Sequence, residues 1–162
     1  MAATNKSMRF FDLKPDTRDG KTPHFQESIP DGKGGYRYES YNSLSGILID
    51  AFLEQKKFEG EEPYNAFKLV LLDGSETIRL GLKPTEAAYS ILSRLGNSKP
   101  GIPVELEVRK GKTKSGHDYC KSMVMQDGEN LEWDIDITGN IEGDRRAYFE
   151  EYFEEIVKPL CE

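Results

Sequence analysis

The chain has 162 residues, of which 36% are hydrophobic and 31% are charged, and its formal net charge is −7. This length suits one domain with appendages, which can bury a core without stabilising disulfides or metals. The sequence begins without a signal-peptide pattern and contains no apolar run of membrane-spanning length. Its two cysteines, Cys120 and Cys161, exclude a disulfide framework and a zinc knuckle, so we expect a soluble, cytoplasmic protein.

The charges are unevenly distributed along the chain. Residues 1–125 contain 19 basic and 17 acidic side chains, a net of +2, whereas residues 126–162 contain 3 basic and 12 acidic ones, a net of −9. Binding to a charged ligand depends on local patches rather than on the total charge. The overall acidity therefore does not exclude nucleic acid as a partner of the nearly neutral body.

Residues 1–42 form the first of three predicted regions, an N-terminal arm. Residues 12–35 are rich in proline, glycine and charged side chains, a composition that buries little apolar surface and favours turns. We therefore expect the arm to be loosely ordered. Within it, Tyr36, Arg37 and Tyr38 alternate as the side chains of an exposed strand do.

Residues 43–126 are predicted to form the folded core. Asp73-Gly74 suits a turn between two apolar segments, and Val104, Leu106 and Val108 alternate with charged residues, as in a strand with one buried face. The predicted elements are strands at 45–58, 63–72 and 76–82, a helix that begins at Pro84 and is capped by Gly96, and strands at 103–109 and 117–125.

This order places one helix between the third and fourth of five strands. It is the element order of the OB-fold, a small Greek-key barrel. We therefore predict a mainly β protein with a five-stranded, OB-fold-like barrel and an additional C-terminal amphipathic helix. A generic α+β sheet sandwich is the alternative.

Residues 127–162 form the third region, an acidic C-terminal segment. Its apolar residues recur at spacings of three and four, which predicts a helix that Asp144 caps and Pro159 ends. The apolar stripe either packs on the barrel, pairs with another copy of itself or docks into a partner protein. The candidate partner-binding residues are Phe149, Tyr152, Phe153 and Ile156.

The sequence gives little support for catalysis. His24 and His117 are far apart in the chain, and no hydrolase, metalloprotease or nucleotide-binding motif occurs. Glu132, Asp134 and Asp136 alternate as along one strand face and could gather a divalent cation, but such a run is more often a solvated face. We expect no enzymatic activity, no cofactor and no metal.

Basic and aromatic residues point instead to nucleic acid. The segment 109–121 is a predicted hairpin rich in lysine, which can follow a phosphate backbone; the alternative is a solubilising turn. A nearby aromatic ring can stack on an unpaired base. The candidates in this hairpin are Arg109, Lys110, Lys112, Lys114, Tyr119 and Lys121, and those on the first three strands are Lys56, Lys57, Phe58, Tyr64, Lys68 and Arg79.

With its lysine-rich KGKTKSG turn and acidic end, the chain resembles the single-stranded DNA-binding proteins of bacteriophages and bacteria. The resemblance covers about half of the chain. It implies an OB-fold that binds single-stranded DNA without sequence preference in replication, recombination or repair, inside a bacterium or a phage-infected cell. It also implies an acidic tail that recruits replication or recombination proteins. The tail departs from the family pattern, because its aromatic residues have helical spacing and its tip is Pro159-Leu160-Cys161-Glu162.

Three other functions remain open at this stage. The main alternative is a protein–protein adapter that uses the barrel and the aromatic helix. Binding to RNA in place of DNA and a metal-dependent nuclease are the other two, and a homo-oligomer is compatible with each of these functions.

Overall fold

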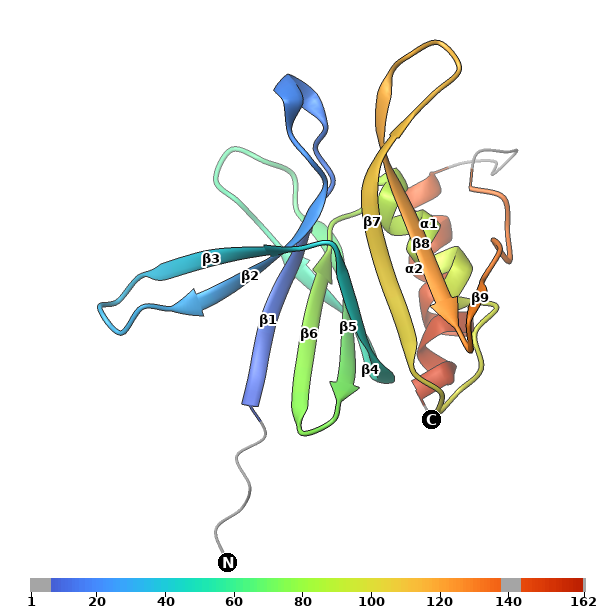
Figure 1. Cartoon of the computed structure of the whole chain (residues 1–162), viewed down its shortest axis with the longest axis horizontal. Helices are drawn as coiled ribbons and strands as arrows, with labels where there is room; N and C mark the ends of the chain where they lie inside the picture. Colours follow the sequence, from blue (N-terminus) through green and yellow to red (C-terminus); the bar gives the residue numbers. More distant parts are fainter. Residues whose placement is uncertain (1–6, 138–143, 162) are drawn as a thin grey trace, which may run out of the picture.

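The computed structural model of the chain describes residues 7–137 and 144–161. The nine strands in this part of the chain form one sheet (Figure 1). The strands are β1 (Ser7–Lys14), β2 (His24–Pro30), β3 (Tyr36–Tyr41), β4 (Ser43–Lys56), β5 (Tyr64–Asp73), β6 (Glu76–Leu82), β7 (Val104–Lys112), β8 (Asp118–Gln126) and β9 (Glu129–Asn130). Their order in the sheet is β3-β2-β1-β6-β5-β4-β7-β8-β9. The pair β1–β6 is parallel, and the other neighbouring strands are antiparallel.

The predicted closed barrel is wrong. The five strands expected in the core are β4 to β8, and the helix α1 (Glu86–Leu95) lies between β6 and β7 as predicted. However, β8 pairs with β7 and β9, while the remaining edge of β6 pairs with β1. The N-terminal arm therefore occupies the edge that would have closed a barrel, and the sheet stays open.

The expectation of a loosely ordered arm is also wrong, because residues 7–14, 24–30 and 36–41 are strands. Phe11, Leu13 and Phe25 are buried in the core, which is enough apolar burial to hold β1 and β2 in the sheet. The glycines of the arm lie in its connections, where Gly32 and Gly34 adopt positive φ. Composition averaged over the arm concealed this division between strands and turns.

β4 belongs to both halves of the sheet. Its first residues, Ser43–Gly46, pair with β7, and the stretch from Ile47 to Lys56 pairs with β5, with a register shift between Leu48 and Asp50. A Cβ on Gly46 would lie 2.9 Å from the carbonyl oxygen of Leu72, so only glycine lets the two backbones approach so closely at the bend.

The helices lie on the core side of the sheet, against its β7–β8 half (Figure 1). Thr85 caps α1 by accepting a hydrogen bond from the Ala88 amide at 3.3 Å, so the helix begins just after the predicted Pro84. The second helix, α2 (Arg145–Tyr152), continues as a π-helical turn (Phe153–Val157) and a 3₁₀ turn (Lys158–Cys161). Asp144 caps α2 as predicted, because its carboxylate accepts from the Arg146 amide at 2.9 Å.

The aromatic stripe of the C-terminal helix lies in the core. Phe149 stacks on Tyr89 of α1 with ring centroids 4.3 Å apart, and Phe153 contacts Phe67 of β5 at 5.2 Å. Phe149, Tyr152 and Phe153 are buried, and Ile156 is exposed. Of the three alternatives for this stripe, packing on the body is the one observed, so these buried rings do not form an accessible docking surface.

Among residues 7–137 and 144–161, no helix has both the length and the apolarity needed to cross a membrane.

Candidate nucleic-acid interface

The side of the sheet that faces away from the core is called the outer face. Strand register aligns one row of directly paired residues across six strands of it, in the order Tyr38, Ser28, Phe10, Arg79, Val70 and Asp50. The next row contains Asp12, Gly81, Lys68 and Phe52. Residues from β3 near the N-terminus and from β4 and β5 in the core thus share one surface.

A cluster of cations and an aromatic ring occupies the centre of the outer face. The Arg79 guanidinium lies 4.9 Å from the centroid of the Phe52 ring and donates to Glu54 at 2.5 Å. The Lys56 ammonium lies 2.6 Å from the other oxygen of the same carboxylate. The hydrogen bond with Lys56 is the main reason that the pKa of Glu54 is lowered. Glu54 therefore stays ionised at neutral pH and binds two cations, of which Arg79 lies over the Phe52 ring.

Lys68 lies beneath this cluster. Its side chain passes over Gly81, where an added Cβ would lie 2.8 Å from the Lys68 ammonium and 2.6 Å from the Asp12 carboxylate. Burial is the largest cause that lowers the pKa of Lys68, and the nearby Lys56 acts in the same direction. Lys68 is thus a buried supporting cation rather than an exposed phosphate contact.

The first exposed aromatic pair lies where β4 ends and β5 begins. The rings of Phe58 and Tyr64 are stacked, with centroids 6.2 Å apart and an angle of 28° between their planes. The Lys83 ammonium lies 5.8 Å from the Phe58 ring. Phe58 is 48% exposed, so one side of this cation-flanked pair is open to solvent.

The second aromatic group lies on β1 and β3. Phe10, Tyr36 and Tyr38 are 47%, 59% and 60% exposed, and together with Ser28 and Pro30 they line a shallow hollow. Sequence reasoning did not assign these rings to the site. The alternation of Tyr36 and Tyr38 was visible, but nothing in the sequence showed that β1 would bring Phe10 between them and Arg79.

A polar network on the core side holds the β2–β3 hairpin to β1. The Arg9 guanidinium donates to both carboxylate oxygens of Glu27 at 2.8 Å and to Glu76 at 3.0 Å. The Tyr41 hydroxyl donates to Glu39 at 2.9 Å, and its oxygen lies 3.2 Å from the Glu27 carboxylate. These contacts fix the aromatic rings of β3 relative to the rest of the outer face.

The lysine-rich hairpin between β7 and β8 divides its cations between two sides. The ammonium groups of Lys110 and Lys112 lie 3.8 Å and 3.4 Å from the Asp118 carboxylate. Arg109 pairs with Lys121, and both point to the opposite side of the hairpin. The pairing of β7 with β4, and of β4 with β5, shows that this side continues the outer face. On that side Tyr119 covers Gly111, since a Cβ there would lie 2.7 Å from its ring. Lys114 is exposed in the connecting turn.

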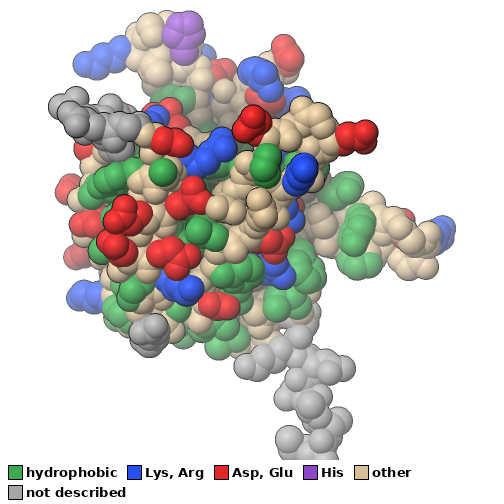
Figure 2. Space-filling model, turned by 180° about the vertical axis from the view of Figure 1, so that it is seen from behind, with side chains coloured by type: hydrophobic (Ala, Val, Ile, Leu, Met, Phe, Trp, Pro, Cys, Tyr) green, Lys and Arg blue, Asp and Glu red, His purple; other side chains and the backbone are tan. Residues whose placement is uncertain are grey.

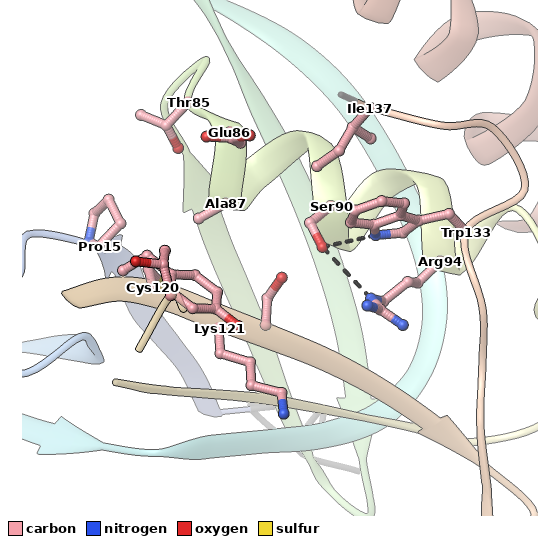
Figure 3. Close-up of a pocket in the computed structure, with 13 residues that line it drawn as sticks. Pro15, Thr85, Glu86, Ala87, Ser90, Arg94, Cys120, Lys121, Trp133 and Ile137 are labelled. Atoms are coloured by element: carbon pink, nitrogen blue, oxygen red, sulfur yellow. Dashed lines mark hydrogen bonds between the residues drawn. The ribbon is translucent and has the colours of Figure 1, made fainter. Parts of the chain in front are cut away.

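A groove of about 590 Å³ lies next to α1, and residues 119–122 of β8 are part of its lining (Figure 3). Trp133 donates from Nε1 to the Ser90 hydroxyl at 3.0 Å, and Arg94 lies 5.4 Å from the Trp133 ring. Arg94 also donates to the carbonyl of Leu131 at 2.7 Å, so it fastens this segment to α1. Burial raises the pKa of the Cys120 thiol to about 11, which leaves it protonated and unreactive at neutral pH.

The three acidic residues that were expected to alternate along one strand face do not lie on a strand. No strand occurs at residues 131–137, so the alternation of Glu132, Asp134 and Asp136 does not place them on one strand face. Asp134 instead accepts a hydrogen bond from the Tyr152 hydroxyl at 2.9 Å.

The chain matches no protein-family model, no curated protein and no solved structure.

The outer face brings together only some of the residues expected from the sequence. Lys56, Phe58, Tyr64 and Arg79 lie on it or at its rim, and Lys57 is exposed just after β4. Lys68 is buried, and the hairpin candidates are split between two sides. The rings of Phe10, Tyr36, Tyr38 and Phe52 are added by the fold.

Proposed function

We propose that the protein binds single-stranded nucleic acid, with single-stranded DNA as its main ligand, across the outer face of its sheet. The observation that carries this proposal is the presence of two exposed aromatic groups on one side of the sheet, with Arg79 between them. Aromatic rings stack on any base and cations follow any phosphate, so this combination binds single strands with little sequence preference.

The size of the outer face supports the same ligand. Its rows cross six strands, and five strand spacings of about 4.8 Å correspond to about 24 Å. OB-folds, which have a different architecture, bind about 4–16 nucleotides, so a surface of this length has room for several nucleotides. A duplex would bury its bases and leave the exposed rings without stacking partners. A protein of this kind would hold exposed single strands during replication, recombination or repair.

The distribution of charge is consistent with this side of the molecule being the ligand side. In the view from behind, acidic side chains gather over the part of the molecule that carries the helices (Figure 2). Residues 126–162 contribute 12 acidic side chains and only 3 basic ones. Repulsion of phosphates by the helical side favours approach to the outer face.

A fluorescence anisotropy titration tests the proposal. Oligo-dT, oligo-rU and a duplex of equal length are compared at several salt concentrations. We expect the tightest binding for oligo-dT, a decrease in affinity as salt increases, and much weaker binding to the duplex. Equal affinity for duplex and single strand, or no binding at low salt, would contradict the proposed function.

A further inference from the structure

The two edges of the sheet differ in how they are protected. β9, at one edge, is a two-residue strand of Glu129 and Asn130. β3, at the other edge, has six residues, and those from Tyr36 to Ser40 are exposed. Natural proteins protect edge strands with charged side chains, above all lysine, and with proline, bulges or very short strands. β3 carries one positive and one negative side chain, which form an ion pair with each other. β3 contains neither lysine nor proline, and its pairing with β2 shows no register shift. Its free edge is thus open to another strand.

The sequence of β3 is complementary to itself in one antiparallel register. We propose that two copies of the chain associate through their β3 strands, with Tyr38 opposite Tyr38 of the partner subunit. Arg37 then lies opposite the partner's Glu39, and by symmetry Glu39 lies opposite the partner's Arg37. A two-fold interface of this kind repeats each contact.

Charge selects this register over its neighbours. A pairing centred on Arg37 would place two guanidinium groups opposite each other, and a pairing centred on Glu39 would place two carboxylates opposite each other. Directly opposed side chains in antiparallel strands have Cβ atoms about 4.5–5.5 Å apart, so like charges there destabilise the pair. Only the register centred on Tyr38 gives two attractive pairs.

The β2–β3 hairpin is already held in a fixed conformation in the single chain. Arg37 already lies 2.6 Å from Glu39 in the same chain, and Glu39 also accepts from Tyr41. The network of Arg9, Glu27 and Tyr41 holds the strand in place, so little ordering is needed on association. Figures 1 and 2 both show the hairpin projecting from the body, which leaves room for a second copy at its edge.

The pairing would also extend the outer face. Opposed residues in antiparallel strands point to the same side of a sheet, so Tyr38 from both copies would lie side by side. The aromatic groups formed by Phe10, Tyr36 and Tyr38 in the two copies would then become one surface. This consequence rests on the proposed function, whereas the association itself does not.

Sedimentation and light scattering without nucleic acid test the pairing. The wild-type protein is expected to dimerise, and Arg37→Glu and Glu39→Arg should each raise the dimer dissociation constant by about tenfold or more through two like-charge contacts. An equimolar mixture of these two variants should recover the dimer, because both cross-strand pairs are then opposite in charge. Lys33→Glu, at the exposed turn of the same hairpin, is the matched control and should dimerise like the wild type.

Circular dichroism establishes that each variant is folded. Should Glu39→Arg disturb the contact with Tyr41, Tyr38→Lys gives a second test, since it places two ammonium groups opposite each other and should also yield monomers. A monomeric wild type, a dimer that survives Arg37→Glu, or a mixture that stays monomeric would overturn the proposal. None of these outcomes depends on whether the monomer binds single-stranded DNA.

Discussion

Gly96 follows the last residue of α1, where the sequence predicted a glycine cap. The residue does occupy the cap, but its φ is −58°, a right-handed value that any residue adopts. Glycine is needed there for space, because an added Cβ would overlap the Tyr152 hydroxyl and would lie 3.1 Å from the Cβ of Asp134. The end of α1 is therefore fixed by the C-terminal helix rather than by its own backbone.

This contact predicts non-additive mutations. Gly96→Ala should lower the free energy of unfolding by about 1–3 kcal/mol through overpacking. Tyr152→Phe alone should cost about 0.5–1.5 kcal/mol, because it removes the hydrogen bond to Asp134. In the double variant the overlap with the hydroxyl is gone, so urea unfolding should show less destabilisation than the two single effects added together. Strict additivity would contradict the proposed contact.

Single aromatic rings on the outer face give a second prediction. Phe10→Ala and Tyr64→Ala should each weaken binding to oligo-dT by about 1–3 kcal/mol if the rings carry bases. Tyr148→Ala is the matched control, since Tyr148 is 39% exposed on α2, on the helical side of the molecule. Anisotropy titrations measure the affinities, and thermal unfolding identifies any ring needed for stability. Equal losses in all three variants would refute a specific aromatic site.

The β2–β3 hairpin shows how a charged contact positions a whole element. Glu27 is buried to 6% exposure and accepts two hydrogen bonds from Arg9, whose own side chain is 26% exposed. Those hydrogen bonds are the main cause that lowers the pKa of Glu27 below its ordinary value of 4.5, while burial opposes it. The folded hairpin is thus stabilised by the ionised form of Glu27.

The pH dependence of unfolding tests this anchor. Because the folded pKa is lowered, the stabilisation is fully present above pH 4.5 and is lost as the pH falls below that value. Glu27→Gln should cost about 2 kcal/mol at neutral pH, less than a fully buried pair because Arg9 is partly exposed. The difference between wild type and variant should shrink on acidification below pH 4.5. A difference that is independent of pH would show that the charge of Glu27 is not the cause.

The C-terminal helix is a second element whose role depends on burial. Phe149, Phe153 and Val157 are 0% exposed, and each such side chain contributes about 1.5–3 kcal/mol when buried. Their sum is comparable with the total stability of a domain, about 5–15 kcal/mol. A chain ending at Gly143 should therefore be insoluble or lack a cooperative unfolding transition. A soluble, cooperatively folded truncation would show that the helix is dispensable.

The elements from β4 to β8 were predictable because their signals are local, whereas β1 and β2 were not recognised in the proline- and glycine-rich arm. The alternation of Val104, Leu106 and Val108 gave β7 and its buried face, and the turn at Asp73-Gly74 gave the β5–β6 hairpin. The pairing of β1 with β6 was not predictable, because the two strands are about 70 residues apart in the chain and the side chains of β1 would fit beside other strands equally well. The second aromatic group depends on that pairing, so the sequence indicated only part of the candidate site.

At the scale of the whole molecule, the open sheet changes which lysines can act together. A closed barrel would have placed the β7–β8 hairpin as one of two loops around a ligand. In the open sheet the hairpin has two distinct sides, one with Arg109 and Lys121 and the other with Lys110 and Lys112 beside Asp118. A strand bound to the outer face meets only the first side.

Two variants with equal loss of charge therefore distinguish the sides of the hairpin. Each phosphate contact with a single strand contributes about 0.7 to the slope of log K against log salt. Arg109→Ala combined with Lys121→Ala should reduce this slope by up to about 1.4 and should weaken binding to oligo-dT. Lys110→Ala combined with Lys112→Ala removes the same charge, but its cations already lie near Asp118 on the other side, so it should leave the slope close to that of the wild type. Anisotropy titrations over a range of salt concentrations measure both slopes. A larger loss from the Lys110 and Lys112 variant would place the bound strand on the Asp118 side of the hairpin and away from the outer face.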